Sequence, residues 1–265
     1  MIPVAAQQGC PLVIAHRGGG GEAPENSMAA FQRLDELGVH HLETDAHVSA
    51  DGVVVLSHDP VVDRTYDGSG AIIDMTWREI SQLRNAAGER MPTLAEVLEA
   101  HPTAWFNIDA KSDEVVDPLL DVLDSHKAFG RVMLASFEVS RLERIRTAGY
   151  EDISTSLGTA EVVRLLAAAT TASNPASWWV PGPRRGVRAV QVPETWGPVR
   201  IVDRRFIAAA HARGLAVHVW TVNDASQMMR LADLGVDGIV TDRPTMLRGL
   251  LEARGTWRPA PTPQD

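Results

Sequence analysis

The chain has 265 residues, 45% of them hydrophobic, and its 25 basic and 34 acidic side chains give a formal net charge of −9. An acidic chain without a basic run is a poor electrostatic partner for nucleic acid or an anionic membrane, so any anion site must be local. No run approaches the roughly 20 apolar residues that span a bilayer, and a single cysteine, Cys10, excludes an intrachain disulfide. The first residues lack a secretory pattern, so we expect a cytoplasmic protein with no stable membrane anchor.

Short β-rich apolar runs alternate with longer amphipathic patterns along the chain. The predicted strands cover residues 12–16, 41–45 with 53–56, 105–109, 132–135, 152–156, 189–192, 216–220 and 238–241. The predicted helices cover residues 27–38, with Asn26 as N-cap, and 93–100, 114–126, 138–148, 160–169, 203–213, 225–234 and 245–254. Eight such units without a dinucleotide-binding fingerprint predict an α/β fold that closes as a (β/α)8 TIM barrel; an open doubly wound sheet is the alternative.

Two segments interrupt this rhythm. Residues 60–91 are rich in Asp, Gly and Thr and contain a short predicted helix at 77–83, which indicates a small insertion after the second strand. After residue 255 come Pro259, Pro261 and Pro263, which cannot continue a helix. We therefore expect one domain over residues 1–255 and a disordered tail over 256–265.

Acidic side chains gather at the ends of two predicted strands. Glu43 and Asp45 are two residues apart, so they lie on the same face of their strand, and Asp109 on the next strand can approach them. Three carboxylates in one small space repel each other unless a cation neutralises them. Oxygen ligands suit one divalent cation, Mg²⁺ or Ca²⁺, with Mn²⁺ as a further option. The alternative is that these are rim acids paired with arginines.

Two histidines follow strand ends beside these acids. His16 and His58 are the proposed general acid and base, because the unperturbed pKa of histidine, about 6.5, suits proton transfer near neutral pH. His47 has the parity of Glu43 and Asp45 and stays unassigned. The remaining histidines lack acidic neighbours and are interpreted as structural or exposed: His40, His41, His101, His126, His211 and His218.

Two cations and one aromatic residue complete the predicted site. Arg17 can bind a phosphate with two N–H groups and Lys111 as a point charge; salt bridges to the rim acids are the alternative for both. Trp220 ends the seventh strand, where it either walls a substrate pocket or serves packing. The glycine run at 18–21 is not followed by Gly-Lys-Ser/Thr, so a nucleotide P-loop is unsupported.

Taken in this order, the motifs resemble the glycerophosphodiester phosphodiesterase family, in its bacterial cytoplasmic type. They are His16-Arg17-Gly18, Pro24-Glu25-Asn26-Ser27, Glu43-Thr44-Asp45, Asp51-Gly52, His58-Asp59, Pro92-Thr93-Leu94, residues 107–111, residues 220–223 and residues 235–242. The resemblance implies a barrel with an insertion after strand two and a divalent metal held by Glu43, Asp45 and the acid of strand three. It also implies acid–base roles for His16 and His58 and phosphate contacts from Arg17 and Lys111. The family usually has Glu where this chain has Asp109.

The predicted activity is metal-dependent hydrolysis of a small-molecule glycerophosphodiester to glycerol 3-phosphate and an alcohol. Water, or the substrate's own glycerol hydroxyl, is the nucleophile. Two alternatives stay open: a phospholipase D-like lyase acting on lysophospholipid or sphingomyelin, and a non-catalytic phosphoester-binding barrel. The sequence leaves open the head group, the physiological metal, the oligomeric state and which histidine is the acid.

Overall fold

The computed structural model describes residues 3–5 and 9–258, and within them eight parallel strands close into a barrel. The barrel strands are β1 (Leu12–Ala15), β2 (His41–Val48), β4 (Trp105–Ala110), β5 (Val132–Ala135), β6 (Ser154–Ser156), β7 (Val187–Pro193), β10 (Ala216–Trp220) and β11 (Gly238–Thr241). β1 pairs in parallel with both β2 and β11, which closes the sheet. The predicted TIM barrel is therefore confirmed, and the open sheet is excluded.

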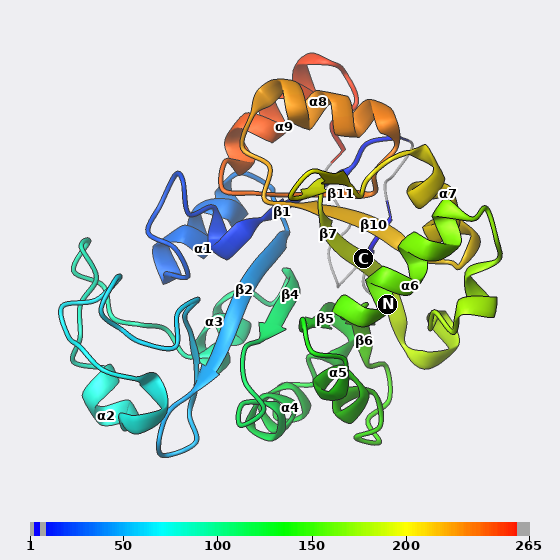
Figure 1. Ribbon diagram of the computed structural model, residues 1–265. Coiled ribbons are helices and arrows are strands. Elements are labelled where there is room, and N and C mark those ends of the chain that lie inside the picture. Colours follow the sequence, from blue (N-terminus) through cyan, green and yellow to red (C-terminus); the bar gives the residue numbers. More distant parts are fainter. Residues whose placement is uncertain (1–2, 6–8, 259–265) are drawn as a thin grey trace.

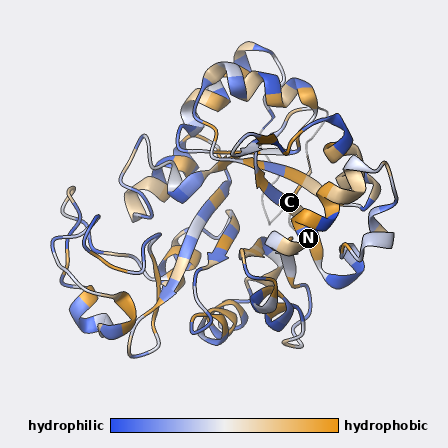
Figure 2. Cartoon of the chain, in the orientation of Figure 1, coloured by the Kyte–Doolittle hydropathy of each residue, from blue (hydrophilic) through white to orange (hydrophobic). Residues whose placement is uncertain are grey.

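Helices surround the strands on the outside of the barrel (Figure 1). They are α1 (Met28–Glu36), α3 (Leu94–Ala100), α4 (Val116–Ser125), α5 (Val139–Arg146), α6 (Thr159–Thr170), α7 (Arg204–Ala212), α8 (Ala225–Leu234) and α9 (Pro244–Ala253). Single turns of 3₁₀ helix add η1 (His16–Gly18), η3 (Phe129–Arg131), η4 (Pro175–Trp178) and η5 (Pro183–Arg185). Hydrophobic and hydrophilic residues alternate along the outer helices, as expected for helices that bury one face against the strands (Figure 2).

The N-cap of α1 is Ser27, whose Oγ accepts a hydrogen bond from the Ala30 amide at 3.1 Å. The prediction of Asn26 as the cap was wrong. The Asn26 side chain instead accepts a hydrogen bond from Thr44 Oγ1 at 2.7 Å and donates to Asp45 at 3.3 Å. An amide at this position therefore ties the start of α1 to the acidic strand β2.

A small subdomain follows β2, at the lower left of Figure 1. The chain reverses at Gly52, which has a φ of 86°, so residues 54–56 pair back on β2 as the antiparallel strand β3 (Val54–Leu56) and do not extend it. The insertion then forms η2 (Ile72–Asp74) and α2 (Trp77–Ile80). Its apolar side chains bury one another in a cluster of their own: Val55, Val62, Tyr66, Ile72, Ile80 and Met91.

Two buried histidines lie at the opposite end of the strands from the acids. His41 Nε2 lies 3.0 Å from the Pro3 carbonyl, and His218 Nε2 lies 2.7 Å from the Val4 carbonyl. Burial lowers the pKa of His41 to about 4 and also lowers the pKa of His218. Both rings are therefore neutral hydrogen-bond donors that hold an N-terminal segment, as their structural interpretation expects.

Two segments differ from the sequence expectation. A two-stranded hairpin that was not predicted, β8 (Thr195–Trp196) and β9 (Val199–Arg200), follows β7. At the other end, Trp257 packs against the core, and its amide donates to the Leu251 carbonyl at 3.1 Å. The expected tail therefore begins with docked residues, while 259–265 lie outside the described residues. Across the described ranges, no helix is long and apolar enough to cross a membrane.

Candidate active site

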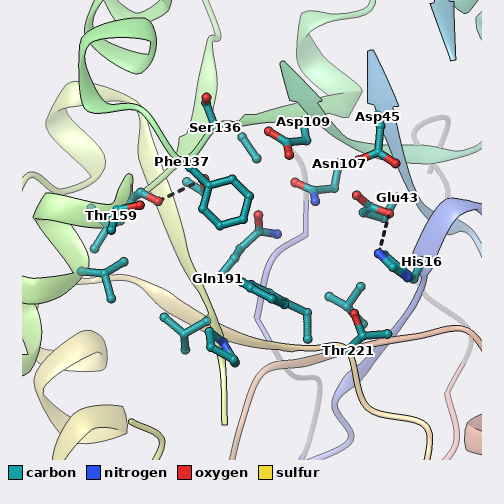
Figure 3. A pocket seen from close by; sticks show the side chains of 18 of the residues that line it. His16, Glu43, Asp45, Asn107, Asp109, Ser136, Phe137, Thr159, Gln191 and Thr221 are labelled. Atoms are coloured by element: carbon teal, nitrogen blue, oxygen red, sulfur yellow. Dashed lines mark hydrogen bonds and ion pairs between the residues drawn. The ribbon is translucent and has the colours of Figure 1, made fainter. Parts of the chain in front are cut away.

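A cavity of about 530 Å³ opens at the carboxyl ends of the barrel strands. All eight residues singled out in the sequence line this cavity: His16, Arg17, Glu43, Asp45, His58, Asp109, Lys111 and Trp220. Figure 3 shows His16, Glu43, Asp45 and Asp109 along one side of it. The barrel topology explains this convergence, because parallel strands bring their carboxyl ends to one rim.

His16 is oriented by an acid from the far end of the chain. Its Nδ1 lies 2.7 Å from Asp242 Oδ1, and Asp242 Oδ2 accepts a hydrogen bond from Asn223 Nδ2 at 2.6 Å. The contact places a proton on Nδ1 and leaves Nε2 for the cavity, 4.0 Å from Glu43 Oε2. Burial lowers the pKa of His16, but the Asp242 hydrogen bond and the Glu43 charge outweigh it, so the pKa is raised overall.

His58 has the same kind of partner. Its Nδ1 lies 2.6 Å from Asp59 Oδ1, which again leaves Nε2 for the cavity. Arg64 binds both Asp59 and Glu25, and Glu25 also pairs with Arg17 at 3.3 Å. The hydrogen bond from Arg64 lowers the pKa of Asp59 to about 2. This chain of ion pairs joins the insertion to the rim of β1, so the two sides of the site hold each other in place.

His47, to which the sequence analysis gave no role, contacts the backbone of His58. It is not among the described lining residues of the cavity, and its Nε2 lies 3.3 Å from the His58 carbonyl oxygen. Burial lowers the pKa of His47, which keeps the ring neutral and able to donate that hydrogen bond.

The three carboxylates are buried and lie on adjacent strands. Asp45 on β2 is the register partner of Asp109 on β4, and Glu43 is the partner of Asn107. Lys111 Nζ lies between the two aspartates, 2.7 Å from Asp45 and 2.8 Å from Asp109. The alternative of rim acids paired with arginines holds for Asp45, which lies 3.4 Å from Arg17 Nε, and the salt bridges considered for Arg17 and Lys111 are both present.

Burial strongly affects the protonation of this acid cluster. Burial, together with the neighbouring charge of Asp45, raises the pKa of Glu43 to about 8. Burial also raises the pKa of Asp109, against the lowering effect of the Lys111 charge. Carboxyls that resist ionisation in this way gain most from an additional positive charge placed among them.

The donor set fits a hard divalent cation. Glu43, Asp45 and Asp109 offer carboxylate oxygens, and Asn107 Oδ1 beside them is buried without a hydrogen-bond partner among the described residues. Oxygen-only donors of this kind suit Mg²⁺ or Ca²⁺. Across residues 3–5 and 9–258, however, no three acid, histidine or cysteine side chains stand together in ligating geometry, because Lys111 lies between two of the acids.

Several contributors were not predicted from the sequence as site residues. Asp242 and Asp59 orient the histidines, Asn223 positions Asp242, and Asn107 adds an oxygen donor. Two of them carried a signal that could have been used: Asp242 directly follows β11, and Asn107 shares the parity of Asp109 on β4. Asp59 adjoins His58 in sequence, but nothing there indicates that its carboxylate binds the ring.

These features define a class of protein: an enzyme of the TIM-barrel type whose rim is equipped to cleave a phosphoric diester. The chain belongs to the glycerophosphoryl diester phosphodiesterase family, whose model matches residues 16–246. It is accordingly a hydrolase of that family, a glycerophosphodiester phosphodiesterase.

Individual relatives agree with this assignment. The chain is 34% identical to "Probable glycerophosphodiester phosphodiesterase 2" of Mycobacterium tuberculosis, over 95% of this chain and 94% of that protein. It is 30% identical to a human lysophospholipase D, over 90% of this chain and 85% of the relative. A solved phosphodiesterase of Oleispira antarctica, in complex with the product sn-glycerol-3-phosphate, has the same fold with a TM-score of 0.75, at 24% identity over 91% of this chain and 97% of that one.

Proposed function

We propose that this enzyme hydrolyses glycerophosphodiesters to sn-glycerol 3-phosphate and an alcohol, with one divalent cation held by Glu43, Asp45 and Asp109. The observation that carries the proposal is the pairing of two histidines with two aspartates across one cavity, His16 with Asp242 and His58 with Asp59. Each pair leaves an Nε2 for proton transfer, so one histidine can act as general base toward the nucleophile and the other as general acid toward the leaving oxygen.

The chain's own residues support each part of this reaction. Arg17 and Lys111 line the cavity and have donors beyond those used in their ion pairs, so they can bind the phosphoryl oxygens. One histidine takes a proton from the attacking water, and the other gives a proton to the leaving oxygen of the alcohol. A bound cation supplies further stabilisation of the negative charge that builds up on the phosphoryl group.

A second route uses the same residues. If the free glycerol hydroxyl of the substrate attacks, the first product is a cyclic phosphate, as in a phospholipase D-like lyase. The human relative is named a lysophospholipase D, so acylated substrates are a second candidate class for this enzyme. The two chains are similar over most of their length. Whether this enzyme also accepts acylated substrates therefore depends on which groups the walls of its cavity can bind.

Phosphorus NMR of the products distinguishes the two routes. The purified chain is incubated with glycerophosphocholine and Mg²⁺, and we expect sn-glycerol 3-phosphate to accumulate from the start. If a cyclic phosphate remains as the final product, the enzyme catalyses the lyase reaction and not hydrolysis. No phosphorus-containing product with Mg²⁺, Mn²⁺ or Ca²⁺ would refute the proposed function.

A further inference from the structure

The cavity has two chemically different walls. Its charged lining side chains lie on β2 and β4 or just after β1, β3 and β4, and Figure 3 shows Glu43, Asp45 and Asp109 together on that side. The opposite wall comes from the ends of β5, β6 and β7 and from α6. Among the described residues, no charged side chain lines that second wall. The cavity therefore changes from strongly polar to uncharged over the width of the barrel mouth.

Apolar side chains dominate the uncharged wall. They are Phe137, Leu157, Val162, Val163, Leu166 and Trp196, and we call them the apolar wall. Helix α6 supplies three of them, none of which is among the residues that this helix buries fully, and the β8–β9 hairpin supplies the tryptophan. The Phe137 ring meets Trp220 edge-on at 5.9 Å between centroids, so the apolar wall continues onto the aromatic residue at the end of β10.

Three members of this wall are unusually exposed for their type. Phe137 is 57% exposed, Val163 51% and Trp196 59%, although all three line the same cavity. Val199, the register partner of Trp196 in the hairpin, is 52% exposed. Large apolar side chains that gather around a cavity and remain open to water are typical of a site that an apolar ligand group covers.

A small polar substrate cannot use this wall. A glycerophosphodiester with its phosphate near Arg17 and Lys111 and a short head group would leave Val163 and Trp196 facing water. An alkyl chain attached to the same phosphodiester would cover them. Each methylene that becomes buried is expected to strengthen binding by up to about fourfold.

We propose that the apolar wall binds a linear alkyl chain, so that the preferred substrates are amphipathic phosphodiesters rather than fully deacylated ones. This inference rests on the proposed function, because it places the chain beside the phosphate-binding end of the same cavity. The chain can come from two sources: an acyl group on the glycerol arm, as in a lysophospholipid, or the leaving alcohol.

Two series of soluble substrates distinguish these sources. The first carries acetyl, butanoyl, hexanoyl or octanoyl chains on the glycerol of glycerophosphocholine, and the second joins glycerol phosphate to ethanol, butanol, hexanol or octanol. All are assayed as monomers, below their aggregation concentrations. We expect kcat/KM to rise with chain length, through KM, in one series. A rise in the first assigns the chain to the glycerol arm, and a rise in the second assigns it to the leaving group.

A matched pair of variants tests whether the wall itself is responsible. Trp196→Ser removes an exposed tryptophan from the cavity, and Trp179→Ser removes one that is 81% exposed and is not among the described lining residues. We expect Trp196→Ser, and Leu166→Gln beside it, to lower the ratio of kcat/KM for the octyl substrate to that for the shortest one by at least about tenfold. Trp179→Ser should keep the wild-type ratio.

Failure of this inference is distinct from failure of the proposed function. Hydrolysis of glycerophosphocholine with kcat/KM flat or falling along both series would overturn the alkyl-chain site and leave the proposed function intact. If no substrate is turned over, the proposed function fails, and calorimetry with octyl phosphate and ethyl phosphate then decides the inference alone. Tighter octyl binding with a negative heat-capacity change supports the site, and equal affinities overturn it.

Discussion

The Nδ1 atom of His16 lies 2.7 Å from Oδ1 of Asp242, across 226 positions of sequence. The contact exists because β1 and β11 are neighbours in the closed barrel, so the residues that follow them meet at the rim. Asn223 holds the other oxygen of Asp242 at 2.6 Å, which fixes the direction of the carboxylate. One histidine of the site is thus oriented by the closure of the fold itself.

Asp242→Asn tests this orientation. The new amide oxygen can still accept from Asn223, so its NH₂ group would face His16 Nδ1 and favour the tautomer with the proton on Nε2. We expect kcat to fall by at least about tenfold, with an unchanged melting temperature. In a His16→Ala background the same change should have little further effect, because its action passes through the ring. Additive losses would show that Asp242 acts independently of His16.

Loss of His16 or His58 should lower kcat more than loss of any other histidine in the described structure. We expect His16→Ala and His58→Ala each to lower kcat by about 10²–10⁴-fold, the usual contribution of general acid–base catalysis. His126→Ala is the control, since that ring contacts Glu99 and the Val122 carbonyl and does not line the cavity. If both variants kept the wild-type kcat, the proton-transfer roles assigned to His16 and His58 would be wrong.

The sequence predicted the barrel well where a strand is a short apolar run bounded by polar residues. The bounds of β5, β10 and β11 agree with the prediction to the residue. The β8–β9 hairpin was missed because strands of two residues are too short to show any periodicity. The β3 segment was assigned to β2, since its apolar residues continue the pattern and only the reversal at Gly52 changes the partner.

The site was predictable as a set of residues and not as a network. Strand ends alone placed Glu43, Asp45 and Asp109 at one rim, because parallel topology does so for any barrel. The partners of the histidines and the bridging position of Lys111 depend on side-chain directions and on pairing between distant segments. No local pattern encodes such contacts, and the apolar wall opposite them is drawn from four separate elements and loops.

Asp109 is the carboxylate that β4 contributes to the acid cluster. We expect Asp109→Ala to weaken cation binding by at least about tenfold, since it removes one of three anionic donors and leaves Lys111 to repel the cation. Asp109→Glu should retain catalysis but change the relative activity with the two metals, because Ca²⁺ tolerates irregular shells and Mg²⁺ does not. Calorimetric titration of each metal measures both effects. Unchanged affinity in Asp109→Ala would make this aspartate a partner of Lys111 alone.

The C-terminal segment should contribute to stability, contrary to the expectation of a wholly disordered tail. Trp257 packs on the core, and the Arg248 guanidinium lies 5.8 Å from the centre of its ring. Ending the chain at Gly255 should therefore lower Tm by about 2–6 °C, from a loss of about 1–2 kcal/mol. Trp257→Ala in the full chain is the matched variant and should reproduce most of this loss in a thermal melt. An unchanged Tm in both variants would mean that the docked residues do not contribute to the stability of the fold.

The proposed reaction depends on a divalent cation that the buried carboxylates at this rim would hold. The most direct measurement is the initial rate of sn-glycerol 3-phosphate release from glycerophosphocholine, before chelation, after exhaustive treatment with EDTA, and after Mg²⁺, Mn²⁺ or Ca²⁺ is returned. We predict that chelation abolishes release and that at least one of the three cations restores it, in the wild type and not in Glu43→Gln. Full activity in chelated protein would show that cleavage of the phosphodiester does not need a divalent cation.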